Sequence, residues 1–305
     1  MAFLKKYEYV LAVSQCGSIS QAAETLGVAQ PTLSKFLKKL EGELGAELFD
    51  RATVPLALTP AGELFLETGK KMLDQEKQFQ KQLQEILSRK NSVIRVGISP
   101  SRSPYLMPSI VRAYRAKHPD GRVIIEEKTT AELSSRLATG DLDLIITLAD
   151  GETQNFVGTV LFEETLLLAT PNGSEYAGRS TAELLATIPL INVGQGQAMW
   201  QTVNAITDAI GIRRPDIECQ SIESGLALVK HGLGSMIVPS YIRDFGTDSQ
   251  KTSVLFHSFS EEERARLNVP MERRVCLFYR NEQFLTQAEK DFIDCAVRMS
   301  LGQLI

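Results

Sequence analysis

One stretch near the N-terminus combines small polar and basic side chains at a spacing that suits contact with phosphate. On a helix, which turns by about 100° per residue, this stretch presents a polar face that has no acidic residue. The face consists of Pro31, Ser34, Lys35 and Lys38, flanked by Thr32 and Lys39. Lysine ammonium groups attract phosphate oxygens as point charges. The alternative is an amphipathic helix with an ordinary solvated face.

A loop further along the chain combines three hydroxyl groups with one guanidinium. It follows a strand-like run at residues 93–98 and precedes a helical pattern that starts near Pro104. Free amides at a helix N-terminus and a guanidinium both favour anions, so we predict a site for a carboxylate or a similar small anion. Its predicted residues are Ser99, Ser101, Arg102 and Ser103, with Thr129 and Thr130 after the next strand. The alternative is that these hydroxyl groups only cap helices.

Other residue patterns offer little for catalysis or metal binding. The three histidines lack metal-ligand spacing, and neither a nucleophile elbow nor a P-loop occurs. Residues Gly194–Met199 superficially match a dinucleotide fingerprint, but Met199 stands where a small residue is required. We therefore predict no enzyme activity, no metal and no cofactor.

Composition and cysteine usage bound the class of protein. The chain has 305 residues, with 33 Lys and Arg against 37 Asp and Glu, which is typical of soluble globular proteins and sufficient for about two domains. The four cysteines are far apart and form no C-x-x-C pair, so we interpret them as inert thiols of a cytoplasmic protein. Redox sensing by Cys219 stays open as an alternative. No apolar run is long enough to cross a membrane, so we expect no membrane partner.

Two short helices must position the basic face. Ser18 and Gln21 have the spacing of a capping box, which predicts a helix start, and Gly27 suits the left-handed conformation that ends a helix. The second helix carries an apolar stripe at helical spacing, consisting of Leu33, Phe36, Leu37, Leu40 and Leu44. A pair of helices joined by a tight turn, the second one polar and basic, is typical of a helix-turn-helix.

A long helix is predicted to follow at residues 60–90. Thr59 is a suitable N-cap and Pro60 a favourable first helical residue. Apolar residues recur in a heptad pattern that predicts pairing with a second helix. They are Phe65, Met72, Phe79, Leu83 and Ile86. The alternative is a helix that packs on its own domain.

Beyond residue 92, strand-like and helical segments alternate. The strand-like runs lie at residues 93–98, 122–128, 142–147, 166–170, 190–193 and 235–238. The helical segments lie at residues 105–117, 131–139, 199–210 and 224–231. This order predicts an α/β domain with largely parallel sheets.

The N-terminal residues resemble the LysR-type transcriptional regulators over the range from Phe3 to Thr59. The matching motifs are Gly17-Ser18, Ala22-Ala23, Leu26, Val28, Gln30-Pro31, Leu33-Ser34, Leu40-Glu41, Glu43-Leu44-Gly45, Leu48-Phe49-Asp50-Arg51 and Leu58-Thr59-Pro60-Ala61-Gly62. The resemblance implies a winged helix-turn-helix whose DNA contacts are Gln30, Pro31, Thr32, Ser34, Lys35, Lys38 and Arg51. One position departs from the family pattern, because Ala29 stands where a serine is usual.

The resemblance also implies a C-terminal domain similar to periplasmic solute-binding proteins, with two lobes and a small-molecule cleft. We expect this all-α winged helix-turn-helix at residues 1–59, the linker helix at 60–90 and the α/β effector-binding domain at 91–305. Lobe I would comprise residues 91–162 and 268–305, and lobe II residues 163–267, with crossovers near Glu163 and Asn268. The implied cleft residues are Ser99, Ser101, Thr129, Thr147, Gln195, Gly196 and Gln197.

These expectations combine into one functional hypothesis. The chain is predicted to be a sequence-specific transcriptional regulator that responds to a small, anionic effector. Its predicted partners are double-stranded DNA with a dyad-symmetric operator, the effector, further copies of itself in a homodimer or homotetramer, and RNA polymerase. The competing hypothesis is a two-lobed small-molecule-binding protein or enzyme whose N-terminal helices serve only to oligomerise.

Overall fold

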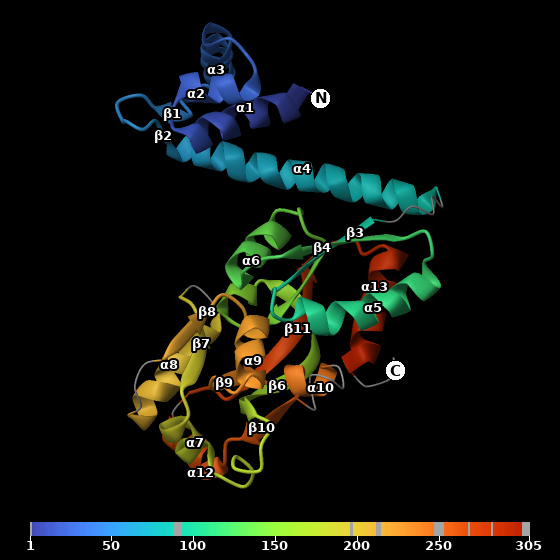
Figure 1. The fold of residues 1–305 in the computed structure, drawn as a ribbon. Helices are drawn as coiled ribbons and strands as arrows, with labels where there is room; N and C mark the ends of the chain where they lie inside the picture. Colours follow the sequence, from blue (N-terminus) through green and yellow to red (C-terminus); the bar gives the residue numbers. More distant parts are fainter. Residues whose placement is uncertain are drawn as a thin grey trace. The chain divides into compact units, whose positions relative to one another are not determined.

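The computed structural model describes residues 2–87, 93–195, 198–211, 215–246, 253–267, 269–281 and 283–300. The chain forms two compact units, Met1–Leu87 and Ser88–Ile305 (Figure 1). Three residues named in the sequence analysis, Gly196, Gln197 and Asn268, lie outside the described part, as does the side chain of Ile86. No helix of the described residues is both long enough and apolar enough to span a membrane.

The N-terminal unit consists of four helices and a two-stranded antiparallel sheet. The helices are α1 Ala2–Cys16, α2 Ile19–Leu26, α3 Gln30–Leu44 and α4 Pro60–Ile86, and the strands are β1 Phe49–Asp50 and β2 Ala57–Leu58. The Ser18 side chain accepts a hydrogen bond from the Gln21 amide at 3.5 Å, and Gly27 ends α2 with a φ of 65°. Ala29 begins α3 without a side-chain cap. The predicted start and end of α2 are confirmed.

The apolar stripe of α3 packs into the core of the N-terminal unit. Leu33, Leu37 and Leu40 are buried, and Phe36 is half-buried with its ring centroid 4.8 Å from that of Tyr9. The prediction was wrong for Leu44, which is 47% exposed. Leu44 is the last residue of α3, so it lies beyond the part of the helix that the core covers. Each buried leucine contributes about 1.5–3 kcal/mol relative to exposure.

Glycine permits close packing where α4 begins. The Thr59 hydroxyl accepts a hydrogen bond from the Gly62 amide at 3.1 Å and donates one to the Glu47 carbonyl at 2.6 Å. A Cβ atom at Gly62 would lie only 2.1 Å from the Leu48 carbonyl oxygen. Because backbone on the neighbouring segment cannot move aside easily, this position admits only glycine.

Replacing Gly62 with alanine should therefore destabilise the N-terminal unit. We expect Gly62→Ala to lower its free energy of unfolding by about 1–3 kcal/mol, since the added methyl group forces the backbone apart. Thermal and urea unfolding of the full chain, followed by circular dichroism, measure this change.

A matched control is Gly42, which also lies in a helix but has no atom within 4 Å of an added Cβ. Gly42→Ala should raise stability by about 0.5–1 kcal/mol, because alanine restricts the unfolded chain and favours helix. Equal effects of the two substitutions would contradict the packing argument.

The C-terminal unit consists of α-helices packed around a mixed β-sheet. Its strands are β3 Val93–Ile98, β4 Arg122–Glu127, β5 Leu144–Leu148, β6 Phe156–Pro171, β7 Leu190–Val193, β8 Ile217–Cys219, β9 Ser235–Pro239, β10 Val254–Ser258 and β11 Glu272–Arg280. Its helices are α5 Ser103–Lys117, α6 Thr130–Ala138, η1 Gly151–Thr153, α7 Thr181–Thr187, α8 Ala198–Ile210, α9 Ile222–Lys230, α10 Tyr241–Phe245, α12 Glu261–Leu267 and α13 Gln287–Ser300.

Strand order divides this unit into two lobes that share one long strand. The order is β4-β3-β5-β11-β6-β9-β7-β8, with β10 paired to β6. One hydrophobic cluster contains buried residues of β3, α5, β5, β11 and α13, and we call this part lobe I. A second cluster contains buried residues of the second half of β6, α7, β7, α8, α9 and β9, and we call it lobe II. The first half of β6 pairs with β11, and its second half pairs with β9 and β10.

The expectation of largely parallel sheets was only half right. The outer pairs β3–β4, β3–β5, β7–β8 and β7–β9 are parallel, whereas every pair that involves β6 or β11 is antiparallel. The sequence analysis missed the first half of β6 and all of β8, β10 and β11. The antiparallel pairs are the ones made by the two strands that run between the lobes, visible side by side in Figure 1.

Candidate functional site

The polar face of α3 is open to solvent. Gln30, Pro31, Thr32, Lys35 and Lys38 are exposed and Ser34 is half-buried. Within the described residues, neither Lys35 nor Lys38 makes an ion pair. The neighbouring Lys39 lies 3.9 Å from Glu43, which also accepts a hydrogen bond from Lys6 at 2.8 Å. That bond from Lys6 is the main reason the pKa of Glu43 is lowered. Two ammonium groups on this face are therefore available to a partner.

Arg51 is tied to the body of the N-terminal unit by a carboxylate that the sequence analysis did not single out. Its Nη2 atom lies 2.8 Å from Glu41 Oε2, while Glu41 Oε1 accepts a hydrogen bond from the Leu48 amide at 2.9 Å. Glu41 is buried, yet the Arg51 side chain is 49% exposed. The motif pair Leu40-Glu41 carried the signal for this role. Glu41 thus fixes α3 to the start of the β1–β2 hairpin and leaves one side of the Arg51 guanidinium free.

The β1–β2 hairpin packs its base on the turn between α1 and α2. The Leu56 amide donates a hydrogen bond to the Gly17 carbonyl at 2.8 Å, and a Cβ at Gly17 would lie 2.8 Å from Pro55 Cβ. At the tip, Val54 is 98% exposed. The hairpin is therefore a small wing that projects from the helices, as the resemblance implies.

Helix α4 uses its predicted heptad residues in two ways. Phe65 is half-buried in the core of its own unit, with its ring centroid 5.8 Å from that of Phe3. The alternative of packing on its own domain is thus correct for the first part of the helix. Further along, Met72, Phe79 and Leu83 are 51%, 58% and 38% exposed. These three side chains form the apolar surface that a second helix would cover.

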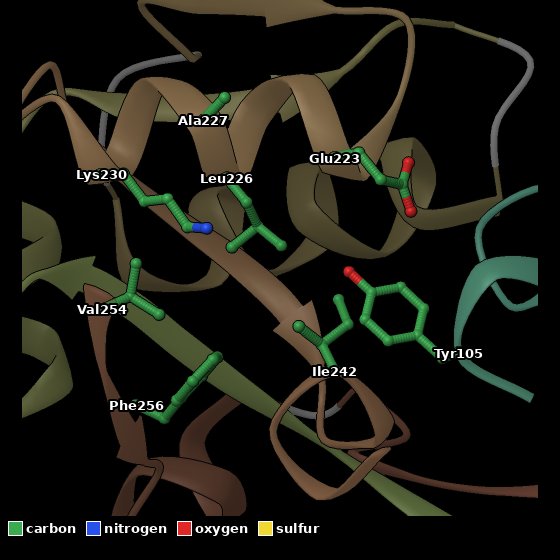
Figure 2. A pocket seen from close by; sticks show the side chains of 8 residues that line it. All are labelled: Tyr105, Glu223, Leu226, Ala227, Lys230, Ile242, Val254 and Phe256. Carbon is green, nitrogen blue, oxygen red and sulfur yellow. The ribbon is translucent and has the colours of Figure 1, made fainter. Parts of the chain in front are cut away.

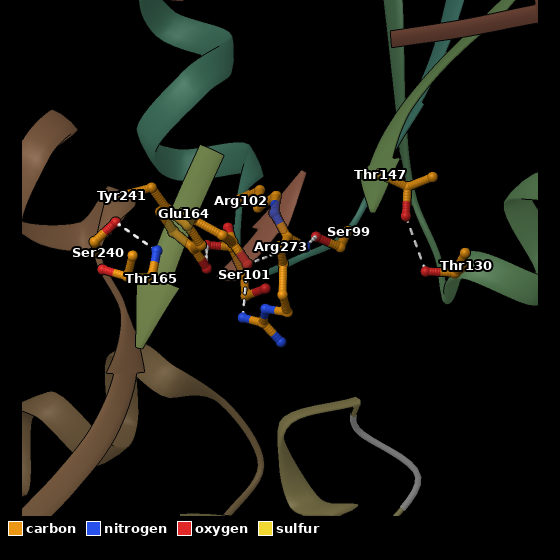
Figure 3. Close-up of polar contacts among 10 residues, drawn as sticks. All are labelled: Ser99, Ser101, Arg102, Thr130, Thr147, Glu164, Thr165, Ser240, Tyr241 and Arg273. Atoms are coloured by element: carbon orange, nitrogen blue, oxygen red, sulfur yellow. Dashed lines mark hydrogen bonds and ion pairs between the residues drawn. The ribbon is translucent and has the colours of Figure 1, made fainter. Parts of the chain in front are cut away.

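A cleft of about 840 Å³ lies between the two lobes. Six of the predicted effector residues line it, namely Ser99, Ser101, Arg102, Thr129, Thr130 and Gln195. Two others lie behind its wall. Ser103 is buried as the first residue of α5. The Thr147 hydroxyl is fully buried 2.9 Å from that of Thr130, so it supports Thr130 and does not line the cleft (Figure 3).

Several hydroxyl groups of the cleft do cap helices, as the alternative held. Thr129 forms a capping box with Glu132, and its hydrogen bonds lower the pKa of that carboxyl. Across the cleft, the Ser221 hydroxyl accepts a bond from the Ser224 amide at the start of α9. These caps leave the first turns of α6 and α9 facing the cavity.

The Arg102 guanidinium is already paired inside the protein. Its Nη2 atom lies 2.8 Å from Glu164 Oε1, and its Nη1 atom donates to the Ser99 hydroxyl at 3.1 Å. The ring of Tyr241 lies 5.3 Å from the guanidinium carbon. The expectation of a free guanidinium in the Ser99–Ser103 loop was therefore wrong, because the sequence does not show that Glu164 folds against this loop.

A second guanidinium, missed by the sequence analysis, lines the cleft beside this pair. The Nη2 atom of Arg273 lies 2.6 Å from the same Glu164 oxygen, and its side chain is 13% exposed (Figure 3). Burial is the main cause that lowers the pKa of Arg273. Tyr241, also missed, donates to the Ser101 carbonyl at 3.0 Å, and burial raises its pKa to about 12. The missing strand assignment for β11 hid Arg273, since no pattern placed it near residue 102.

A second and much smaller cavity of about 80 Å³ adjoins lobe II (Figure 2). Tyr105 and Glu223 face each other across it, and apolar side chains of α9, α10 and β10 form its other walls. Burial, and then the charge of Glu223, raise the pKa of Tyr105. This volume suits a few water molecules and is too small for an organic effector.

The chemistry of metals and thiols finds no obvious place in the described residues. No group of three or more His, Cys, Asp or Glu side chains among them could hold a metal ion. Cys219 is half-buried, and its thiol donates to the Ser221 carbonyl at 3.2 Å. Burial raises the pKa of this thiol, which lowers its thiolate fraction and hence its reactivity.

Comparison with known proteins matches both units of the chain. Residues 4–63 match the family described as bacterial regulatory helix-turn-helix protein, lysR family, and residues 88–300 match the LysR substrate binding domain. An uncharacterized HTH-type transcriptional regulator of Bacillus subtilis, YcgK, is 27% identical over 79% of this chain and 81% of its own length. The dual regulator OxyR of Escherichia coli is 26% identical over 78% and 79%.

Solved structures agree in fold. A full-length OxyR variant from Pseudomonas aeruginosa is 26% identical with a TM-score of 0.61, and the match covers 97% of this chain and 94% of that one. Full-length CbnR in complex with its target DNA shares the fold with a TM-score of 0.60 at 21% identity, over 98% and 100%.

An exposed basic helix, a projecting wing and a C-terminal two-lobed domain define the class of DNA-binding transcriptional regulators with a substrate-binding-type domain. The chain belongs to the LysR family of transcriptional regulators, whose members are regulators and not enzymes.

Removing the Glu41 carboxylate should loosen the wing. Glu41→Ala leaves the Leu48 amide without its partner, and we expect the free energy of unfolding of the N-terminal unit to fall by about 1–3 kcal/mol. Chemical unfolding of the full chain, followed by circular dichroism, measures the loss.

The matched control is Glu43, which lies on the same helix but forms exposed ion pairs. Exposed pairs contribute little, so Glu43→Ala should change stability by less than about 1 kcal/mol. A loss as large as that of Glu41→Ala would show that burial of the Glu41 carboxylate is not what matters.

Proposed function

We propose that this LysR-family regulator reads duplex DNA with the exposed face of α3 and binds a small-molecule effector in the interlobe cleft. The observation that carries the DNA-binding mode is that Lys35 and Lys38 are exposed and without an ion pair within the described chain. Such ammonium groups would contact phosphates, and the nearby Gln30, Thr32 and Ser34 would meet base edges in the major groove. Pro31 would fit the start of the helix against the groove wall, and Arg51 would bind the backbone beside the wing.

Pairing of two chains through α4 would bring two such readers to one operator. Met72, Phe79 and Leu83 present the apolar surface for this contact. A two-fold dimer places its recognition helices about 34 Å apart, in successive major grooves, so the operator should have dyad symmetry. We place this homodimer, or a homotetramer built from two of them, in the cytoplasm with RNA polymerase as a further partner.

An effector acts on DNA occupancy only if it binds two arrangements of the protein with different affinity. The cleft is formed by both lobes, so a ligand inside it contacts both and favours one placement of the lobes. A coupling of about 1–3 kcal/mol between ligand and DNA would be ordinary for such a regulator.

The DNA-binding mode is tested by the double substitution Lys35→Ala and Lys38→Ala. We expect specific operator binding to be lost, and the slope of log affinity against log salt to become less steep by about 2 for any residual binding, one unit for each lost phosphate contact. Fluorescence anisotropy with operator DNA at several salt concentrations gives both values.

The matched control replaces Lys70 and Lys71, two exposed lysines of α4, with alanine. This variant should bind DNA like the wild type, and both variants should remain dimeric by light scattering. If the α3 variant still binds the operator, the competing hypothesis that the N-terminal helices only oligomerise gains the stronger support.

A second candidate function is peroxide sensing, because relatives from several bacteria carry the description hydrogen peroxide-inducible genes activator. The chemistry around Cys219 argues against it in this chain. Its thiol has a raised pKa, and the other three cysteines lie elsewhere in the fold, with Cys276 and Cys295 buried in lobe I. We therefore propose a reversibly bound ligand as the signal.

Oxidation should accordingly leave operator binding unchanged. We expect wild type and Cys219→Ser to bind operator DNA with the same affinity, within about twofold, before and after treatment with hydrogen peroxide, because a thiol with a raised pKa reacts slowly. A change in the wild type that Cys219→Ser removes would establish the redox alternative.

A further inference from the structure

Three buried charges meet where the long strand β6 passes from one lobe to the other. Thr165 of β6 still pairs with Glu272 of β11, whereas Leu166 already pairs with Pro239 of β9. Glu164 is the residue just before this change of partner, and its register partner on β11 is Arg273. Arg102, from the start of α5 in lobe I, reaches the same carboxylate. We call Arg102, Glu164 and Arg273 the crossover cluster.

The crossover cluster has one positive charge too many. Both guanidinium groups approach the same oxygen, Oε1 of Glu164, which is fully buried. Within the described residues, Arg102 Nε, Arg273 Nε and Glu164 Oε2 have no hydrogen-bond partner. A buried polar network that is only partly satisfied is costly, and an uncompensated buried charge more so. An anion next to the cluster would balance its charge.

Only one member of the cluster combines contact with the cleft and a guanidinium edge that is not held on both sides. Arg102 is fixed by Glu164, Ser99 and the ring of Tyr241. Arg273 contacts Glu164 through one terminal nitrogen, and its other terminal nitrogen points away from that carboxylate (Figure 3). A guanidinium edge of this kind binds the two oxygens of a carboxylate side by side.

The remaining walls of the cleft restrict the anion further. The rim carries Glu127, Asp150 and Glu152, which are exposed and would repel a ligand with several negative charges. Deeper in the cleft, Met199, Trp200 and Ile222 offer apolar surface. A single carboxylate on an apolar body satisfies both conditions.

We propose that Arg273 is the anion receptor of the cleft and that the effector is a small organic monocarboxylate, with Glu164 positioning the Arg273 guanidinium. This inference rests on the proposed effector role of the cleft. Because the cluster ties β6 to β11 and to α5, the charge of the bound ligand acts directly on the strand crossover between the lobes. The carboxylate of the ligand thereby completes the charge balance that the fold leaves open.

The chain provides its own reporter and its own matched control. Trp200 is the single tryptophan of the sequence and lines the cleft, so its fluorescence reports occupancy. Arg274 follows Arg273 on the strand and points to the opposite side, where its exposed side chain lies 3.9 Å from Glu163. Arg274→Gln removes the same charge from the same strand without touching the cleft.

The experiment titrates full-length protein with hexanoate, cyclohexanecarboxylate and phenylacetate at constant ionic strength, without DNA. Phenylacetamide, sulfate and citrate are added as a neutral, an inorganic and a polyanionic probe. We expect at least one monocarboxylate to change Trp200 fluorescence and raise the melting temperature of the wild type and of Arg274→Gln. In Arg273→Gln its affinity should fall at least tenfold, and phenylacetamide, sulfate and citrate should bind at least tenfold more weakly than the carboxylate.

Several results would overturn the proposal. These are no binding of any monocarboxylate to the wild type, equal affinity in Arg273→Gln, equal affinity for phenylacetamide, or preference for sulfate or citrate. If Arg273→Gln fails to fold, Arg273→Lys decides, because lysine keeps the charge but not the paired donors. We expect its affinity to lie at least threefold below that of the wild type, and an unchanged affinity would refute the role of the guanidinium. Operator binding by ligand-free Arg273→Gln, which should equal that of the wild type, separates this test from that of the DNA-binding surface.

Discussion

Burial of the apolar stripe of α3 fixes which side of that helix faces outward. Leu33, Leu37 and Leu40 enter the core of the N-terminal unit, and a helix that buries these positions must present residues 31, 34, 35 and 38 to solvent. Glu41 adds a polar anchor on the same side, because its carboxylate holds the amide of Leu48 and the guanidinium of Arg51. The helix and the wing therefore form one rigid surface for DNA. A rotation of α3 by a quarter turn would cost several buried leucines, so the reading face is as stable as the core itself.

A different constraint operates in the C-terminal unit. Two strands, β6 and β11, connect the lobes, and the change of pairing partner along β6 coincides with the crossover cluster. Buried ion pairs contribute little net stability but are sensitive to any change of charge nearby. Placing an unbalanced cluster at the point where the lobes join makes the lobe arrangement responsive to an anion in the cleft. A hydrophobic crossover would be more stable and would not respond to charge.

The two units differ in how far local sequence determined their structure. The capping serine, the C-cap glycine and the apolar spacing predicted α2 and α3 because these signals act between residues a few positions apart. The error at Leu44 arose because periodicity does not reveal where a core ends. In the C-terminal unit, β11 and the first half of β6 were missed, and with them Arg273 and Glu164. These strands are defined by partners more than a hundred residues away, such as Arg273 opposite Glu164, and no local pattern encodes that register.

The sequence by itself determined the family, the two-part organisation, the DNA-reading helix and its exposed lysines, because each depends on short-range motifs or on helical periodicity. Only the tertiary structure decided that Phe65 belongs to its own core, that Thr147 lies behind the cleft wall, and that Arg102 is neutralised from within. It also decided that Arg273 faces the cleft while Arg274 faces away. The physical reason is that charge pairing and burial are set by distances in space, and residues 102, 164 and 273 become neighbours only when the crossover strands have formed.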